Sequence, residues 1–276
     1  MGAYLDFGVQ RLGLERPRVM GILNVTLDSF SDGGQYVDRE RALDQARRMV
    51  SDGADIIDIG GESTRPGAAS VRDEVELDRV IPLVEILARD GIRVSVDTRK
   101  PVVMRAALAA GAGMINDVSA LREPGALEVI ASSNAVVCLG HMQGEPRTMQ
   151  SLPNYNDVVR EVLDFLVERA GQCEMAGISR NRIAIDPGFG FGKTVAHNLQ
   201  LLRSLRTFAD SGYPVVVGLS RKSTLGGITG RDVNERASAS VAAALAAVAR
   251  GALLVRVHDV RETVDALKVW HAIETN

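Results

Sequence analysis

Aromatic residues and cysteines are scarce in this chain of 276 residues. Aromatics make up 4% of the sequence, and the two cysteines are Cys138 and Cys173. Both cysteines lie in apolar segments, with no CxxC pair and no histidine at metal-ligand spacing. We therefore expect two buried thiols, and neither a disulfide nor a zinc site.

The chain also lacks a strong net charge and a long apolar run. Its formal net charge of −3 is too small to indicate nucleic acid or an anionic membrane as a partner. No apolar run reaches the ~18 residues of a membrane span. The first residues include Asp6 and Glu15 and have no apolar core, which argues against a secretory signal. We expect a cytoplasmic protein in which local cations hold any anionic ligand.

Short apolar or β-branched segments alternate with stretches of helical periodicity. Eight such segments are candidate strands, at 19–23, 55–59, 92–96, 114–116, 135–139, 183–185, 214–218 and 253–257. This alternation predicts parallel βαβ units and favours a (β/α)8 TIM barrel. A doubly wound open sheet is the alternative fold.

Glycine and proline positions support the predicted helix boundaries. Pro101 stands where a helix would begin, and Gly53, Gly91, Gly111 and Gly177 stand where helices would end. No linker or low-complexity stretch divides the chain, so we expect one domain over 1–276. Within it, residues 1–17 precede the first strand as a short extension, which could form a hairpin over the barrel bottom.

Every candidate strand ends in polar residues. In a barrel of this class the carboxyl ends of the strands form one rim, where active sites lie. Each residue alone has a plainer reading as a helix cap or turn residue. Together they offer cations and acids suited to a polyanionic ligand with a hydrogen-bonding head. The rim residues are Asn24, Arg65, Asp97, Asn116, Asp186, Ser220, Lys222, Arg256 and His258.

The segment Gly192-Lys193-Thr194 mimics the end of a nucleotide-binding P-loop. That motif needs a glycine five positions before Gly192, where Pro187 stands. Proline has no backbone N–H to bind phosphate, so we do not interpret Lys193 as a nucleotide ligand.

Six segments together resemble the signature blocks of bacterial dihydropteroate synthases. They are NVTLDSFSDGG at 24–34, GGESTRPG at 60–67, NDVS at 116–119, DPGFGFGK at 186–193, SRK at 220–222 and RVHDV at 256–260. The blocks occur in the family's order and span nearly the whole chain, which makes their combination specific.

The resemblance implies a role for each rim residue. Pterin would be bound by Asp97, Asn116, Asp186, Phe191 and Lys222. Pyrophosphate would be held by Asn24, Arg65, Arg256 and His258, with Asn24 also contacting Mg²⁺. p-Aminobenzoate would lie near Phe30, Thr64, Pro66 and Ser220. The catalytic residues implied are Asp97, Lys222 and Arg256.

The implied activity is transfer of a pterin methylene group from pyrophosphate to p-aminobenzoate, giving 7,8-dihydropteroate. Pyrophosphate would leave first, helped by Mg²⁺ and the rim cations, and Asp97 would stabilise the resulting cation. The family further implies folate biosynthesis, inhibition by sulfonamides and a homodimer formed through helices late in the barrel.

Two positions depart from the family pattern: Leu27 replaces a common proline, and Gly140 replaces a methionine that lines the pterin pocket. Two other functions stay open. One is a pterin-binding methyltransferase barrel, although SRK and RVHDV suit pyrophosphate. The other is a pterin-binding barrel without activity, although its charged rim positions are all present. A pyrophosphate-release assay with p-aminobenzoate separates the three.

Overall fold

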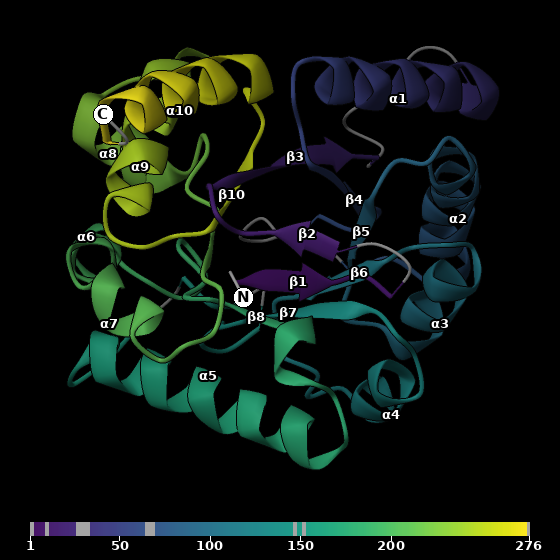
Figure 1. Ribbon diagram of the computed structural model, residues 1–276, viewed down its shortest axis with the longest axis horizontal. Coiled ribbons are helices and arrows are strands. Elements are labelled where there is room, and N and C mark those ends of the chain that lie inside the picture. The colour runs from purple at the N-terminus through teal and green to yellow at the C-terminus, as the bar shows by residue number, and fades with distance from the viewer. Residues whose placement is uncertain are drawn as a thin grey trace.

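Eight parallel strands, surrounded by helices, form the framework of the computed structural model (Figure 1). The structure describes residues 3–8, 11–25, 34–63, 70–145, 148–150 and 153–274. The strands are β3 (Arg18–Asn24), β4 (Ile56–Gly60), β5 (Val94–Asp97), β6 (Met114–Asp117), β7 (Val136–Gly140), β8 (Ile183–Asp186), β9 (Val216–Val217) and β10 (Leu254–Val257). All eight correspond to the segments predicted from the sequence.

The sheet curls into a barrel rather than staying open. Its order is β8-β7-β6-β5-β4-β3-β10-β9, and a parallel bridge between Ile185 and Val215 joins the two outer strands. The (β/α)8 prediction is therefore confirmed, and the doubly wound alternative is wrong.

Helices cover the outside of the barrel (Figure 1). They are α1 (Gly34–Ser51), α2 (Asp73–Arg89), α3 (Pro101–Ala109), α4 (Ala126–Ala131), α5 (Val158–Met175), α6 (Val195–Arg203), α7 (Leu205–Ala209), α8 (Ser223–Thr229), α9 (Ala237–Val248) and α10 (Val260–Glu274), with short 3₁₀ turns η2 (Arg180–Arg182) and η3 (Val233–Glu235). Among the described residues, no helix is both long and apolar enough to cross a membrane.

The predicted helix signals are confirmed. Pro101 occupies the first turn of α3, where its missing N–H costs no hydrogen bond. Gly53, Gly91, Gly111 and Gly177 all have positive φ angles just beyond helix ends, a conformation that residues with a Cβ adopt at a cost.

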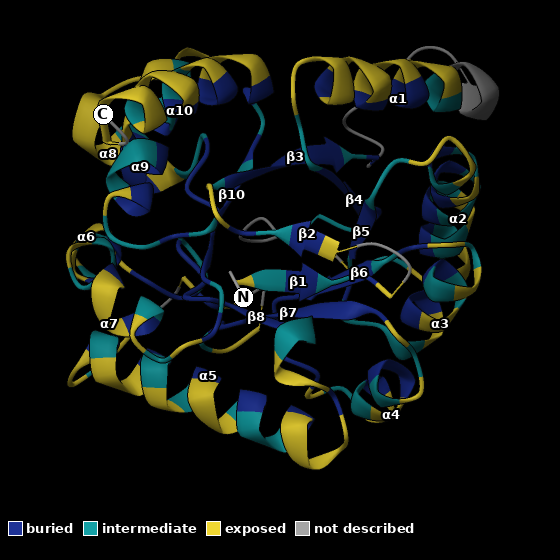
Figure 2. Cartoon of the chain, viewed as in Figure 1, coloured by how far each residue is buried: buried dark blue, intermediate teal, exposed yellow. Residues whose placement is uncertain are grey.

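Alternate residues of seven barrel strands enter two separate hydrophobic clusters. In β4, Ile57 and Ile59 pack in the large cluster with helix residues such as Leu83, whereas Ile56 packs in the smaller one. The smaller cluster contains one or two residues from seven of the barrel strands and fills the lower interior. Figure 2 shows the strands as almost wholly buried. The two cysteines are buried and free, as predicted.

The first residues form the hairpin expected over the bottom of the barrel. β1 (Tyr4–Asp6) and β2 (Arg11–Gly13) pair antiparallel and lie over the middle of the barrel in Figure 1. Leu5, Phe7, Leu12 and Leu14 join the interior cluster, so they close the end opposite the polar rim. Asp55 ties this end together by accepting hydrogen bonds from Arg16 at 3.0 Å and Arg18 at 3.1 Å.

We predict that the hairpin contributes substantially to stability. Leu5 is fully buried, so Leu5→Ala should lower the free energy of unfolding by about 2–4 kcal/mol through lost burial and a residual cavity. Val167, which is 40% exposed on α5, is the control: Val167→Ala should change the free energy of unfolding by less than about 0.5 kcal/mol. Urea unfolding measures both, and equal effects would show that the hairpin is not part of the cooperative core.

Candidate active site

Strand register brings the predicted rim residues of four neighbouring strands into one row. Asn24 of β3 pairs with Gly60 of β4, Gly60 with Asp97 of β5, and Asp97 with Asn116 of β6. Residues in register on parallel strands point to the same face, which here is the barrel interior. Asn24 Oδ1 lies 3.5 Å and Asp97 Cβ 3.8 Å from the position that a Cβ on Gly60 would take. A side chain at position 60 would therefore fill the space between Asn24 and Asp97.

A buried ion-pair network lies at the centre of this row. Arg256 of β10 donates from Nε to Asp58 Oδ2 at 2.6 Å and from an Nη to Asp97 Oδ2 at 2.8 Å. Asn116 Nδ2 also donates to Asp58 Oδ2, at 3.2 Å. Asp58 itself has no solvent exposure. The Asp58 carboxylate therefore links Asn116, which is predicted to bind pterin, to Arg256, which is predicted to bind pyrophosphate.

Asp58 was not identified from the sequence as a site residue. The signal was present, because a carboxylate interrupts the otherwise apolar strand Ile56-Ile57-Asp58-Ile59. A buried charge requires a partner, so such an interruption indicates a polar interior contact.

Asp97 can change its ionisation near neutral pH. Burial raises its pKa to about 7; Arg256 opposes that rise, and the charges of Asp58, Asp117 and Glu76 add to it. Its neighbour Arg256 stays charged, because the two carboxylates outweigh the cost of burial and raise the pKa of the guanidinium.

Asp186 and Lys222 form a second charged group on the opposite strands. Burial raises the pKa of Asp186 while Lys222 lowers it, and Asp186 Oδ1 accepts a hydrogen bond from Gly188 N at 2.7 Å. Burial also lowers the pKa of Lys222 to about 8. The Lys222 ammonium donates to the Phe189 carbonyl and lies 4.4 Å from the centroid of the Phe191 ring. The structure thus brings together Asp186, Phe191 and Lys222, as predicted.

Lys193 holds the loop that carries Phe191. Its buried ammonium contacts His141 Nδ1 at 2.9 Å and the carbonyls of Gly188 at 3.0 Å and Phe191 at 3.1 Å. Burial lowers the pKa of Lys193 to about 7. Burial and the nearby Lys193 charge also lower the pKa of His141, to about 2. These contacts anchor the Lys193 side chain within the loop.

The loop also needs glycine at position 188. Gly188 has a φ of +69°, and a Cβ there would lie 1.9 Å from the His141 carbonyl oxygen. Only glycine combines this conformation with so close an approach of the loop to β7.

Ser220 and His258 lie together where β9 and β10 end. The backbone N–H of His258 donates to Ser220 Oγ at 3.1 Å, and His258 Nδ1 lies 3.1 Å from the same oxygen. Arg221 turns away to pair with Asp259, in a left-handed conformation at φ 57°. Its side chain therefore braces the rim.

Gly140, which departs from the family pattern, lies at a close approach of two backbone segments. A Cβ there would lie 2.8 Å from Val118 Cα, because the backbones of β7 and the segment after β6 approach closely. Beside them, Met142, Met149 and Val118 form a small cluster against which Phe191 packs. This cluster supplies an apolar wall near Phe191.

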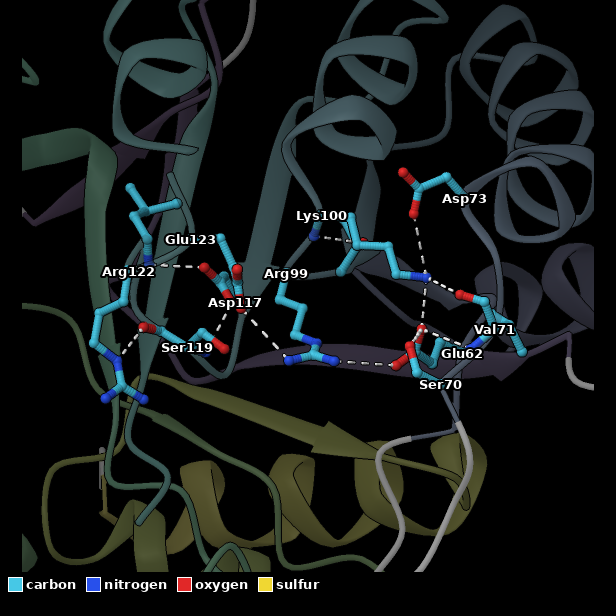
Figure 3. A network of polar contacts seen from close by, with 12 residues as sticks. Glu62, Ser70, Val71, Asp73, Arg99, Lys100, Asp117, Ser119, Arg122 and Glu123 are labelled. Carbon is cyan, nitrogen blue, oxygen red and sulfur yellow. Dashed lines mark hydrogen bonds and ion pairs between the residues drawn. The ribbon is translucent and has the colours of Figure 1, made fainter. Parts of the chain in front are cut away.

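A polar network joins described residues that follow β4, β5 and β6 (Figure 3). Lys100 Nζ contacts Glu62 at 2.7 Å, Glu76 at 2.8 Å and the Val71 carbonyl at 2.5 Å. Burial opposes its charge, but Glu62 and Glu76 outweigh that effect and raise the Lys100 pKa. Asp117 in turn accepts hydrogen bonds from the backbone N–H groups of Ser119 and Leu121, both at 2.7 Å. The sequence did not reveal this network, which depends on contacts between separate loops.

Five predicted positions lie outside the described residues. They are Leu27, Phe30, Thr64, Arg65 and Pro66. Among the residues that are described, no group of three or more His, Cys, Asp or Glu side chains could hold a metal ion. A Mg²⁺ ion that keeps several waters and binds phosphate oxygens needs few protein ligands, and the amide oxygen of Asn24 fits that requirement.

Comparisons with known proteins agree with this geometry. A profile of the family described as "Pterin binding enzyme" matches residues 20–258. The dihydropteroate synthase of Haemophilus influenzae is 52% identical over 262 residues, which cover 95% of this chain and 95% of that protein.

Two solved structures show the same similarity in three dimensions. The Xanthomonas albilineans dihydropteroate synthase with 4-aminobenzoic acid has a TM-score of 0.95 and 55% identity, over 100% of both chains. The Yersinia pestis enzyme in a sulfonamide drug complex has a TM-score of 0.94 and 48% identity, over 99% of this chain and 100% of that one. With the family profile and the relative's identity, these matches favour the synthase over the methyltransferase alternative, and the chain belongs to the dihydropteroate synthases, a family of transferases.

Proposed function

We propose that this chain condenses 6-hydroxymethyl-7,8-dihydropterin pyrophosphate with p-aminobenzoate, giving 7,8-dihydropteroate and pyrophosphate, at the polar rim of its barrel. The observation that carries the assignment of roles is the clustering of Asp97, Asn116 and Arg256 around Asp58. A substrate with a flat, hydrogen-bonding pterin ring and an anionic pyrophosphate requires such a mixture of amide, carboxylate and guanidinium groups. An assay of pyrophosphate release that depends on p-aminobenzoate tests the activity directly.

The pterin edge is assigned to Asp97, Asn116, Asp186 and Lys222. Asp186 presents two acceptor oxygens to the amino and ring N–H donors of a pterin, and Lys222 presents a donor to its carbonyl. Phe191 borders the ring, with Met142 and Val118 behind it.

The pyrophosphate is assigned to Asn24, Arg65, Arg256 and His258. Mg²⁺ bound by Asn24 and the pyrophosphate oxygens would neutralise charge on the leaving group. Arg256 keeps its charge although only 15% of its side chain is exposed, so it can act on an anion with little competition from bulk water.

In the proposed reaction the bond between the methylene carbon and the pyrophosphate oxygen breaks first, and its electron pair leaves with pyrophosphate. The positive charge that remains is delocalised over the pterin, and the Asp97 carboxylate stabilises it. The neutral amine of p-aminobenzoate, held near Phe30, Thr64, Pro66 and Ser220, then forms the new C–N bond and loses a proton. No enzyme nucleophile takes part.

Sulfonamides should compete with p-aminobenzoate for this site, a proposal supported by the sulfonamide complex of the Yersinia pestis relative. A homodimer through the last helices is also proposed, since Ile228, Val233, Val269 and Ile273 are exposed apolar side chains on α8, η3 and α10. Figure 2 shows the exposed outer faces of α8 and α10. The cytoplasmic location stays a prediction.

Asp186→Asn tests the pterin edge. The amide keeps the shape but turns an acceptor into a donor that opposes a pterin N–H, at a cost of ~1–3 kcal/mol. We expect pterin to bind roughly 5- to 150-fold more weakly by calorimetry. Asp55→Asn, at the opposite end of the barrel, should leave pterin affinity unchanged, and an unchanged affinity in Asp186→Asn would refute the assignment.

Arg256→Lys tests the pyrophosphate contact, because lysine keeps the charge but loses the planar fork. We expect kcat/KM for the pyrophosphate substrate to fall by about 10- to 100-fold while bare pterin binds within about threefold of the wild type. Arg18→Lys is the matched control, since Arg18 is also a buried arginine with carboxylate partners, at the other end of the barrel. Equal losses for both ligands would mean that Arg256 supports only the fold.

The order of bond breaking can be tested without p-aminobenzoate. If pyrophosphate leaves first and reversibly, heavy oxygen placed in the bridge to the methylene carbon should scramble into non-bridging positions of recovered substrate. A chelator should stop this exchange while bare pterin still binds. Exchange that requires p-aminobenzoate would instead support direct displacement.

A further inference from the structure

We propose that Asp58 is a positioning residue for the reaction: its single buried carboxylate holds Asn116 and Arg256 in the relative placement that the pterin and pyrophosphate ends of one substrate require. This inference rests on the function proposed above and adds to it a residue outside the predicted rim.

Asp58 is built into the barrel interior rather than exposed at the rim. It is the middle residue of β4, and its solvent exposure is 0%. It pairs in register with Ser95 of β5, one step below the row that contains Gly60 and Asp97. A ligand at the rim would therefore meet Asp97 and Asn116 before it could reach Asp58.

The contacts of Asp58 are directed at two functional residues. Its Oδ2 accepts from Asn116 Nδ2 at 3.2 Å and from Arg256 Nε at 2.6 Å. Its other oxygen, Oδ1, is buried and has no hydrogen-bond partner among the described residues. An oxygen left unpaired in this way is costly, so the carboxylate is not arranged for stability alone.

Burial and geometry make Asp58 the more sheltered of the two partners of the guanidinium. Arg256 lies between two carboxylates, Asp58 and Asp97, and Asp97 has a pKa raised to about 7, with burial as the main cause. Asp97 is at the end of its strand with a 15% exposed side chain, whereas Asp58 is sealed below it. When Asp97 turns to a ligand or takes a proton, Asp58 still fixes the Nε side of Arg256. The remaining N–H groups of the Arg256 guanidinium can then donate hydrogen bonds to pyrophosphate.

The test compares Asp58→Asn with Asp55→Asn. Asp55 is also a carboxylate of low exposure that binds a buried arginine, but at the bottom of the barrel. We expect Asp58→Asn to lower kcat/KM for the pterin pyrophosphate by about 30-fold, as loss of a charged hydrogen bond predicts. Asp55→Asn should stay within about twofold of the wild type, even if it unfolds at a lower temperature.

A double-mutant cycle separates positioning from general support of the fold. In the Arg256→Lys background, adding Asp58→Asn should cost less than about threefold, because the guanidinium that Asp58 holds is already gone. The same 30-fold loss in both backgrounds would overturn the proposal, and so would a single Asp58→Asn variant with nearly normal kcat/KM. If wild type and Asp55→Asn both lack condensation activity, the proposed function fails instead.

A measurement on the unaltered enzyme applies even if Asp58→Asn does not fold. In a crystal structure with pterin, pyrophosphate and Mg²⁺ bound, Asp58 should still contact Arg256 Nε and Asn116 Nδ2 and should not touch the ligand. Movement of Arg256 away from Asp58 on ligand binding would overturn the proposal.

Discussion

The guanidinium of Arg256 in the barrel interior is the interaction around which the site is organised. A buried cation is tolerated only with partners, and Asp58 and Asp97 provide them from two adjacent strands. Asn116 is drawn into the same group through Asp58. The upper interior is therefore a charged network whose members depend on one another, and the proposed pterin and pyrophosphate contacts are neighbours within it.

Below that network lies the interior cluster of apolar side chains, closed at the far end by Leu5, Phe7, Leu12 and Leu14. This division separates stability from function along the barrel axis. The lower half stabilises the fold by packing apolar side chains away from water. The upper half holds polar groups in place and packs less tightly for that reason. The site can therefore contain partly unpaired carboxylates, such as Asp58, because the lower half contributes its packing energy independently.

Two lysines, the buried Lys193 and the partly buried Lys100, each bind several acceptors near the rim of the barrel. Lys193 gathers carbonyl oxygens of the loop after β8, and Lys100 gathers carboxylates and a carbonyl after β4. The contacts of Lys193 with the carbonyls of Gly188 and Phe191 hold the loop after β8 in one shape. Phe191, the proposed border of the pterin ring, is thereby positioned by the protein itself.

The sequence by itself determined the eight strands, the helix ends and the family, and it placed Asp97, Asn116, Asp186, Lys222 and Arg256 at one rim. Strand periodicity and turn residues are local, and the carboxyl ends of parallel strands meet wherever the barrel closes. Only the tertiary structure decided that Arg256 pairs with Asp58 and Asp97, that Lys193 binds the carbonyls of its own loop, and that the backbone of Gly140 lies close to that of Val118. These facts depend on strand register and on close approaches between segments far apart in the chain, which no local pattern encodes.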